Sequence, residues 1–299
     1  MNEIIVKEIR TNEIERLKED FIKYLDVEEL TIKAYITGIS AFQQYLKTNF
    51  IQFPTREDII AFRDSLRETH KPNTINTYLI ALRSFFSWLE YIGIAKDITK
   101  NIKGIKLERI HLKRGLSQEE IEKVLRVCKD LREILLVKLA ITCALRINEI
   151  ANIELQDFYN DNGVVMLKVL GKARAGLKQD NVKVDSRIFE LIKEYCHDYN
   201  PTDYLFFSTS NNNKGGKMTT KCLREIITNL FKRAGLDMER LSPHSFRHSA
   251  CEILLEENMP IQEVSEFMRH KNLTTTLIYS KELNKRNCQA SAMLGNYLF

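Results

Sequence analysis

LSPHSFRHSACEILLEE, residues 241–257, carries the clearest pattern in this 299-residue sequence. Its apolar residues recur at helical spacing and predict one amphipathic helix. We expect Ser242 to cap that helix and Pro243 to lie in its first turn. His244 and Arg247 are three residues apart, so they share one face of the helix. The residues expected to pack inward are Phe246, Ala250, Ile253 and Leu254.

Four further segments on either side of this helix carry polar side chains of interest. They are TCALRINEI with Arg146, VLGKARAG with Lys172, FMRHKNLTTT with His270, and TLIYS with Tyr279. Each residue alone fits an ordinary role, as an ion-paired arginine, a turn lysine, a helix C-cap histidine or a core tyrosine. A lone HxxR pair is equally weak evidence. Only the ordered combination indicates chemistry.

That ordered combination resembles the tyrosine recombinase (phage integrase) family, whose motifs read GLRxSEL, GKG, HxxRH, GH and TTxxY. The matching positions are Arg146 with Glu149, Lys172 after Gly171, then His244, Arg247 and His248, then His270 and, nine residues later, Tyr279. The resemblance spans the whole chain. In layout it is closest to compact Xer-like recombinases and to those of transposons and plasmids.

The sequence departs from the family pattern at three places. Arg269 stands where the family usually has Gly, Ala173 where Gly is common, and Ser280 where His is usual. The hairpin KARAGLKQDNVK is also longer than expected. Lys178 is therefore a rival to Lys172 for the role of the hairpin lysine.

The resemblance implies a site-specific DNA recombinase in which Tyr279 attacks a phosphodiester and forms a 3′-phosphotyrosyl bond. Two arginine forks, Arg146 and Arg247, can hold both non-bridging phosphate oxygens while charge develops on them. His270 can add a further hydrogen bond. Lys172, on the hairpin, would protonate the leaving 5′ oxygen as general acid.

Two more residues have roles that the sequence leaves open. His244 either accepts the Tyr279 proton or binds a phosphate oxygen. Glu149 either orients Arg146 or is structural. Because a covalent intermediate retains the energy of the broken bond, rejoining needs neither ATP nor a metal. In agreement, the sequence lacks a GxxxxGK[ST] loop, and we expect no cofactor.

The first third of the chain predicts a helical domain. TIKAYITGISAFQQYL and TINTYLIALRSFFSWL repeat one apolar pattern in register and predict two similar helices. Polar side chains near their starts suit phosphate contact at a helix N-terminus, although two amphipathic core helices are the simpler interpretation. These candidate DNA-binding residues are Lys33, Lys71, Asn73 and Thr74.

Around residues 101–115 the apolar periodicity fails in a basic stretch, after which Ser117 and Glu120 form a capping-box pattern. We therefore expect a core-binding domain over 1–110 and a catalytic domain with a C-terminal tail helix over 111–299. In the second domain, residues 163–185 alternate like strands broken by turns and predict a small antiparallel sheet. The fold class is thus mainly α, and the resemblance implies a C-shaped clamp on the duplex.

The composition bounds the function without fixing it. The chain has 45 basic and 40 acidic residues, a net charge of +5, which permits a nucleic-acid partner but does not require one. Six scattered cysteines without a CxxC indicate reduced thiols, and no apolar run approaches membrane-spanning length. We expect a cytoplasmic protein, monomeric off DNA, that binds double-stranded recombination sites as a homotetramer on two duplexes.

Three alternatives deserve weight. A type IB topoisomerase uses the same side-chain types, but the HxxRH and TTxxY order favours the recombinase. His244 and His248 have a spacing that can bind zinc, yet the sequence offers no convincing third ligand for a metallohydrolase. Residues 260–280 could form a helix-turn-helix of a non-enzymatic DNA-binding protein, which would not need Tyr279.

Overall fold

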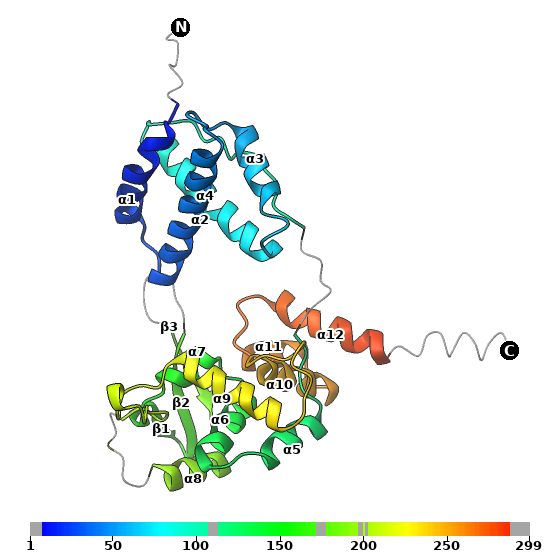
Figure 1. The fold of residues 1–299 in the computed structure, drawn as a ribbon. Coiled ribbons are helices and arrows are strands. Elements are labelled where there is room, and N and C mark those ends of the chain that lie inside the picture. Colours follow the sequence, from blue (N-terminus) through cyan, green and yellow to red (C-terminus); the bar gives the residue numbers. More distant parts are fainter. Residues whose placement is uncertain (1–7, 107–112, 172–177, 197–199, 201–202, 288–299) are drawn as a thin grey trace, which may run out of the picture. The chain divides into compact units, whose positions relative to one another are not determined.

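The computed structural model describes residues 8–106, 113–171, 178–196, 200 and 203–287. The chain divides into two compact units, Met1–Ile110 and His111–Phe299, and each has its own hydrophobic core (Figure 1). The expected class, mainly helical with a small antiparallel sheet, is confirmed. No described helix is both long and apolar enough to cross a membrane.

The first unit is a bundle of helices. Its elements are η1 (Thr11–Glu13), α1 (Ile14–Tyr24), α2 (Glu29–Thr48), α3 (Arg56–Ser65) and α4 (Pro72–Tyr91). Helix α2 lies along α4 at Gly38, where a Cβ atom would be 3.0 Å from both the Cβ of Ala81 and the Cα of Tyr78. A larger residue there would separate the two helices.

The apolar stripes predicted for the first unit do form its core. Ile39, Phe42 and Leu46 of α2 are buried against α4. On α4 the buried residues of the stripe are Ile75, Phe85, Trp88 and Leu89. The interpretation of both segments as core helices is therefore confirmed, whereas their role toward DNA is a separate matter.

The second unit combines helices with one sheet. Its elements are α5 (Gln118–Arg126), α6 (Leu131–Thr142), α7 (Ile147–Asn152), η3 (Leu155–Asp157), β1 (Phe158–Asp161), β2 (Val164–Gly171), β3 (Lys178–Lys183), α8 (Ser186–Tyr195), η4 (Asn211–Asn213), α9 (Thr220–Arg233), α10 (Ser245–Glu256), α11 (Ile261–Phe267) and α12 (Leu273–Asn287). The three strands pair antiparallel in the order β1-β2-β3. The tail at 288–299 lies outside the described residues.

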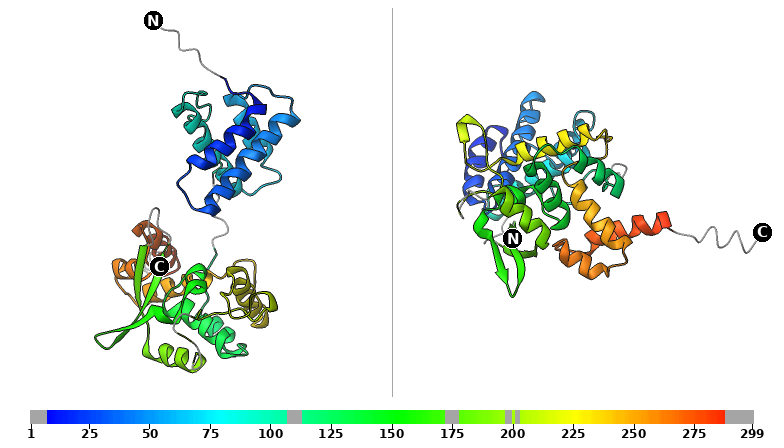
Figure 2. Two further views of the ribbon diagram at one scale, coloured as in Figure 1. Left: turned by 90° about the vertical axis from the view of Figure 1, so that its left-hand side faces the viewer. Right: turned by 90° about the horizontal axis from the view of Figure 1, so that it is seen from below.

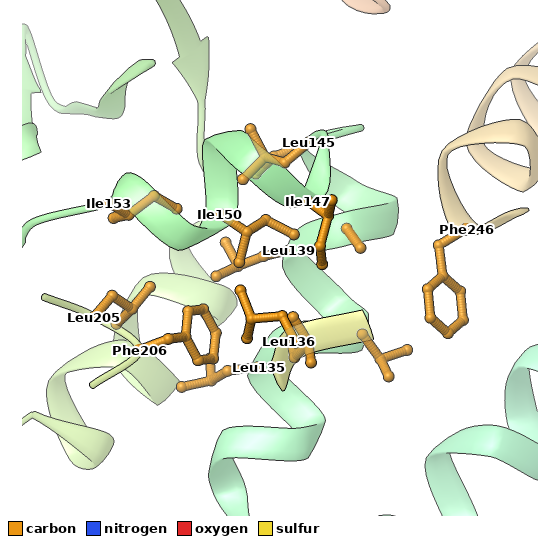
Figure 3. Close-up of a cluster of buried hydrophobic side chains, with 14 of the residues drawn as sticks. Leu135, Leu136, Leu139, Leu145, Ile147, Ile150, Ile153, Leu205, Phe206 and Phe246 are labelled. Carbon is orange, nitrogen blue, oxygen red and sulfur yellow. The ribbon is translucent and has the colours of Figure 1, made fainter. Parts of the chain in front are cut away.

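The core of the second unit is built around α6. Leu135, Leu136 and Leu139 of this helix are fully buried, and Phe206 packs beside them (Figure 3). Phe246 joins the same cluster from α10. In both figures of the fold, α10, α11 and α12 lie together at one side of this unit (Figures 1 and 2). The core thus fixes α10 through its apolar face and leaves its polar face for other contacts.

One prediction for α10 is wrong. The helix begins at Ser245, so Ser242 is not its cap and Pro243 precedes its first turn. The main-chain N–H of Ser242 instead donates to the Ser245 hydroxyl at 3.0 Å, and the Ser245 N–H donates to the Ser242 carbonyl at 2.8 Å. This reversed pairing closes a turn over Pro243, which leaves His244 at the N-cap position.

Candidate active site

The predicted site residues come from four places in the second unit. Arg146 is the N-cap of α7, and His244 is the N-cap of α10, one turn before Arg247. His270 follows α11, and Tyr279 lies in α12. Helices α10, α11 and α12 pack on one another and bring His244, Arg247, His270 and Tyr279 together. Arg146 joins them through its Nη2, which donates to the Arg269 carbonyl at 3.3 Å. Lys172 falls outside the described residues, and its rival Lys178 is the first residue of β3.

Arg247 is the most deeply buried charge of the site, with 6% of the residue exposed. Its Nη1 donates to the carbonyl of Ala144 and its Nη2 to the carbonyl of Met268. Burial, reinforced by the charges of Arg146 and Arg269, lowers the pKa of Arg247 to about 9. The guanidinium therefore stays protonated at neutral pH, and an anion beside it would be strongly attracted.

Arg146 is held by one carboxylate. Its Nη1 donates to Oε1 of Glu149 at 2.7 Å, and its backbone N–H donates to Oε2 of the same residue at 2.8 Å. Burial would raise the pKa of Glu149, but the charge of Arg269 and the bonds from Arg146 outweigh it and lower that pKa. Glu149 thus orients Arg146, as one of the two sequence interpretations had it, while 40% of the Arg146 side chain stays exposed.

His270 is fixed by a hydroxyl. Its Nδ1 lies 2.8 Å from Oγ1 of Thr276, which is fully buried. Burial, followed by the charges of Arg247 and Arg146, lowers the pKa of His270 to about 4. The ring is therefore neutral at pH 7. When Nδ1 accepts from Thr276, Nε2 carries the proton and can donate to a ligand oxygen.

The histidine that contacts Tyr279 is His248. The Tyr279 hydroxyl is hydrogen-bonded to Nδ1 of His248, and the two rings lie 5.3 Å apart between centroids. Burial lowers the pKa of His248 to about 4, so its Nδ1 can accept the phenolic proton at neutral pH. The sequence left open whether His244 accepts this proton or binds a phosphate oxygen. His248 belongs to the HxxRH match, which was the one signal that could have identified it.

His244 lies instead among positive charges. Solvent reaches its side chain, yet partial burial and then the charges of Arg247 and Arg224 lower its pKa. Arg224 is an exposed residue of α9 that no sequence motif singled out. The arginines around His244 would attract an anion, while the negative charge of Glu149 acts on this ring in the opposite direction.

A hollow of about 450 Å³ opens beside His270. Residues of α11 and of the turn after it line most of it, and Asp180 of β3 reaches it from the sheet. The β2–β3 hairpin therefore borders the site. Among the described residues, no three His, Cys, Asp or Glu side chains are grouped as metal ligands.

Comparison with known proteins identifies the family. The phage integrase family matches residues 114–286, and its N-terminal SAM-like domain matches residues 18–91. The chain belongs to the phage integrase family. It is a tyrosine recombinase, and neither the topoisomerase nor the non-enzymatic alternative is favoured.

The matches to its relatives cover most of both chains. Tyrosine recombinase XerA of Pyrococcus horikoshii is 26% identical over 271 residues, which are 89% of each chain. Among solved structures, the XerH recombinase bound to a palindromic difH substrate has a TM-score of 0.74 at 22% identity, over 96% of this chain and 85% of the other. A lambda integrase dimer on a COC′ core site has a TM-score of 0.71 at 14% identity, over 91% and 77%. These two likenesses show a shared fold.

Proposed function

We propose that this recombinase cleaves and rejoins double-stranded DNA through Tyr279, with a 3′-phosphotyrosyl intermediate, and so exchanges strands between two duplex sites. One observation carries the proposal. The Tyr279 phenol is hydrogen-bonded to a neutral histidine of α10, the helix that also carries Arg247, and α10 packs on α11 and α12 beside His270. Arg146 is hydrogen-bonded to the turn that precedes His270.

In the first step, the phenolic oxygen of Tyr279 attacks the scissile phosphorus while its proton passes to Nδ1 of His248. A bond forms between that oxygen and phosphorus, and the bond from phosphorus to the 5′ oxygen breaks. Arg146, Arg247 and the Nε2–H of His270 donate to the non-bridging oxygens, on which charge builds up. His244 adds a fourth donor by our assignment.

The leaving 5′ oxygen must take up a proton, because an alkoxide is a poor leaving group. Lys172 remains our candidate acid, supported by the position of the β2–β3 hairpin at the edge of the site. Rejoining reverses these transfers with a 5′ hydroxyl of the partner duplex. The covalent bond retains the phosphodiester energy, so neither ATP nor a metal is required.

The partner is double-stranded DNA. The solved relatives are bound to DNA sites, and we extend this to both units of the present chain. In the first unit, Lys71 caps α4, with Asn73 and Thr74 in its first turn, so phosphate can approach a helix N-terminus there. Lys33 is exposed but pairs with Glu29 at 2.6 Å, which makes it the weaker candidate. Four protomers are needed because two duplexes present four strands for cleavage.

The test is covalent capture of DNA. The protein is incubated with genomic fragments in EDTA, and adducts that resist SDS are recovered and sequenced. Wild type should yield adducts enriched in one site, whereas Tyr279→Phe should bind that site and yield none. Tyr204→Phe, a change outside the site in the same unit, is the matched control and should behave as wild type. Loss of adducts in EDTA, or adducts with Tyr279→Phe, would refute the proposal.

A further inference from the structure

Arg269 occupies a backbone position that favours glycine. It follows α11 with φ of +51°, in the left-handed region. The backbone N–H of Arg269 donates to the main-chain carbonyl of Glu266 at 2.9 Å, and that of His270 donates to the main-chain carbonyl of Ser265 at 3.0 Å. This is the Schellman arrangement that closes a helix. The residue at this point of the motif is usually Gly because a Cβ atom is strained there. An arginine therefore needs another reason.

The side chain of Arg269 supplies that reason, since only 8% of it is exposed and it is held at three points. Its guanidinium donates to the carbonyls of Cys143 and Ala144, at 3.1 and 3.2 Å, and to Oε2 of Glu149 at 2.8 Å. Its buried Nε lacks a hydrogen-bond partner among the described residues. Both the strain and this unpaired N–H are costs that glycine would avoid.

These contacts reach both catalytic arginines. The side chain of Glu149 is 6% exposed and forms ion pairs with Arg146 and Arg269. Its Oε2 accepts from Arg269 and its Oε1 accepts from Nη1 of Arg146. The carbonyl of Arg269 also accepts from Nη2 of Arg146 at 3.3 Å. On the other side, the Ala144 carbonyl that accepts from Arg269 accepts from Arg247 as well.

The consequence for Arg146 follows from the geometry of a carboxylate. Two guanidinium groups share the carboxylate of Glu149, so the side chain of Arg146 is bound to it through Nη1 only. Without Arg269, Glu149 would be a buried carboxylate with a single cation, and the favoured pairing would be a two-pronged one with Arg146. That pairing would withdraw the Arg146 fork from the phosphate and leave negative charge beside the anion site.

We propose that Arg269 is a positioning residue, which shares Glu149 with Arg146 and so keeps the Arg146 guanidinium aimed at the scissile phosphate. The inference rests on the proposed function for its consequence in catalysis. Its effect on anion binding can be measured without any cleavage.

Arg269→Gly separates this role from a structural one, because it removes the guanidinium and relieves the backbone strain together. At saturating concentrations of the captured DNA site, we expect adduct formation to slow by about tenfold or more, the scale of a misplaced catalytic group. DNA affinity should change less than about threefold. Because Glu149 loses a buried partner, the melting temperature should fall, so the rates are compared at a temperature at which both proteins are folded. Adding Arg269→Gly to Arg146→Ala should slow adduct formation little further, because both changes act through the guanidinium of Arg146.

The chain offers a matched control at the end of α10. Asn258 is exposed and has φ of +62° in the same arrangement. Its backbone N–H donates to the Leu255 carbonyl at 3.1 Å, and the N–H of Met259 donates to the Leu254 carbonyl at 3.0 Å. Asn258→Gly relieves the same strain and should leave the rate unchanged. Arg269→Lys keeps the charge without the planar fork, so its rate should lie between those of wild type and Arg269→Gly.

Inorganic phosphate gives the readout that is independent of cleavage. At constant ionic strength, phosphate should raise the melting temperature of wild type and of Asn258→Gly. In Arg269→Gly and in Arg146→Ala, the rise should be equally small. If wild type forms no adduct, the proposed function fails, and this titration alone decides the role of Arg269. A wild-type rate or a wild-type phosphate response in Arg269→Gly would overturn the inference. Should that variant not fold, Arg269→Lys with wild-type values would do the same.

Discussion

At the scale of single residues, the contact between His248 and Tyr279 makes a prediction about the base. Replacing His248 by Phe keeps a ring in place but removes the acceptor for the phenolic proton. We expect adduct formation at pH 7 to fall by about 10²- to 10⁴-fold, the usual contribution of a general base. The rate of the variant should rise with pH toward the ordinary pKa of tyrosine, because solvent must then remove the proton. Single-turnover adduct formation at saturating DNA measures both effects.

A second ring pair provides the control for this substitution. His70 lies beside Tyr78 in the first unit, with ring centroids 5.7 Å apart. His70→Phe should leave the rate at saturating DNA unchanged. If His248→Phe cleaves at the wild-type rate while His244→Phe does not, the acceptor is His244, and the hydrogen bond to His248 is only a resting contact.

The lowered pKa of His248 also fixes the sign of a pH effect. Its value of about 4 in the folded protein lies below the ordinary 6.5, so between these values the unfolded chain binds more protons. The stability contributed by the neutral ring is complete above pH 6.5 and is lost as the pH falls toward 4. The melting temperature of wild type should therefore decline over this window more than that of His248→Phe.

The candidate residues of the site were named from their motifs, but the motifs did not predict how these residues pair. Spacing on one helix placed His244, Arg247 and His248 within a turn or so of one another. Which histidine contacts Tyr279 depends on how α12 packs against α10. In addition, the N-cap of α10 is His244 and not the predicted Ser242. Such packing leaves no periodic signal in a sequence. The ion pair of Arg269 with Glu149 was hidden for the same reason.

At the scale of elements, the segment between residue 113 and the start of α5 shows how α10 is anchored. The basic stretch before the second unit ends on this helix: the Leu116 N–H donates to the Ser249 hydroxyl at 2.7 Å, and that hydroxyl donates to the Ser245 carbonyl at 2.9 Å. Gly115 permits the approach, because a Cβ atom there would lie 2.9 Å from the Ser249 nitrogen. Arg114, near the end of this basic stretch, forms an ion pair with Glu120 at 2.6 Å.

Ser249→Ala should therefore destabilise the second unit by about 1–3 kcal/mol, because it leaves a buried N–H without an acceptor. Denaturant unfolding of the full chain, followed by a probe in the second unit, measures the change. Thr142→Ala, on α6 of the same unit, is the control, since that exposed hydroxyl donates to the Lys138 carbonyl, four residues back, at 2.9 Å. It should change stability by less than about 0.5 kcal/mol. Equal effects for the two variants would show that the Leu116 contact contributes nothing.

Elements with a strong period were the predictable part of the fold. The stripes of α2 and α4 and the capping box of Ser117 identified helices that the structure contains. Strand β1 was not singled out, although Asn162-Gly163 turns directly from β1 into β2 with positive φ at both residues. An Asn-Gly pair between short strands is a hairpin signal, but at four residues β1 is too short to show alternation.

At the scale of the whole molecule, two separate cores mean that each unit can fold around its own apolar residues. Function still requires both by our proposal, since the first unit has no catalytic side chain and the second would hold DNA with only part of the phosphate contacts. The C-shaped clamp on the duplex came from the family resemblance and stays a prediction, because the connection at 107–112 lies outside the described residues.

A fragment of residues 111–299 tests this division of labour. It should bind the captured DNA site much more weakly than the full chain, and its affinity should depend less on salt. Each lost phosphate contact removes released counterions and reduces the slope of log affinity against log salt by about 0.9. In the intact chain, the double change Lys33→Ala and Lys71→Ala isolates two of these charges and should flatten the slope by no more than about 1.8. If the fragment and the full chain bind with equal affinity and equal slope, residues 1–110 have no role in holding DNA, and the candidate contacts at the starts of α2 and α4 are only surface charges.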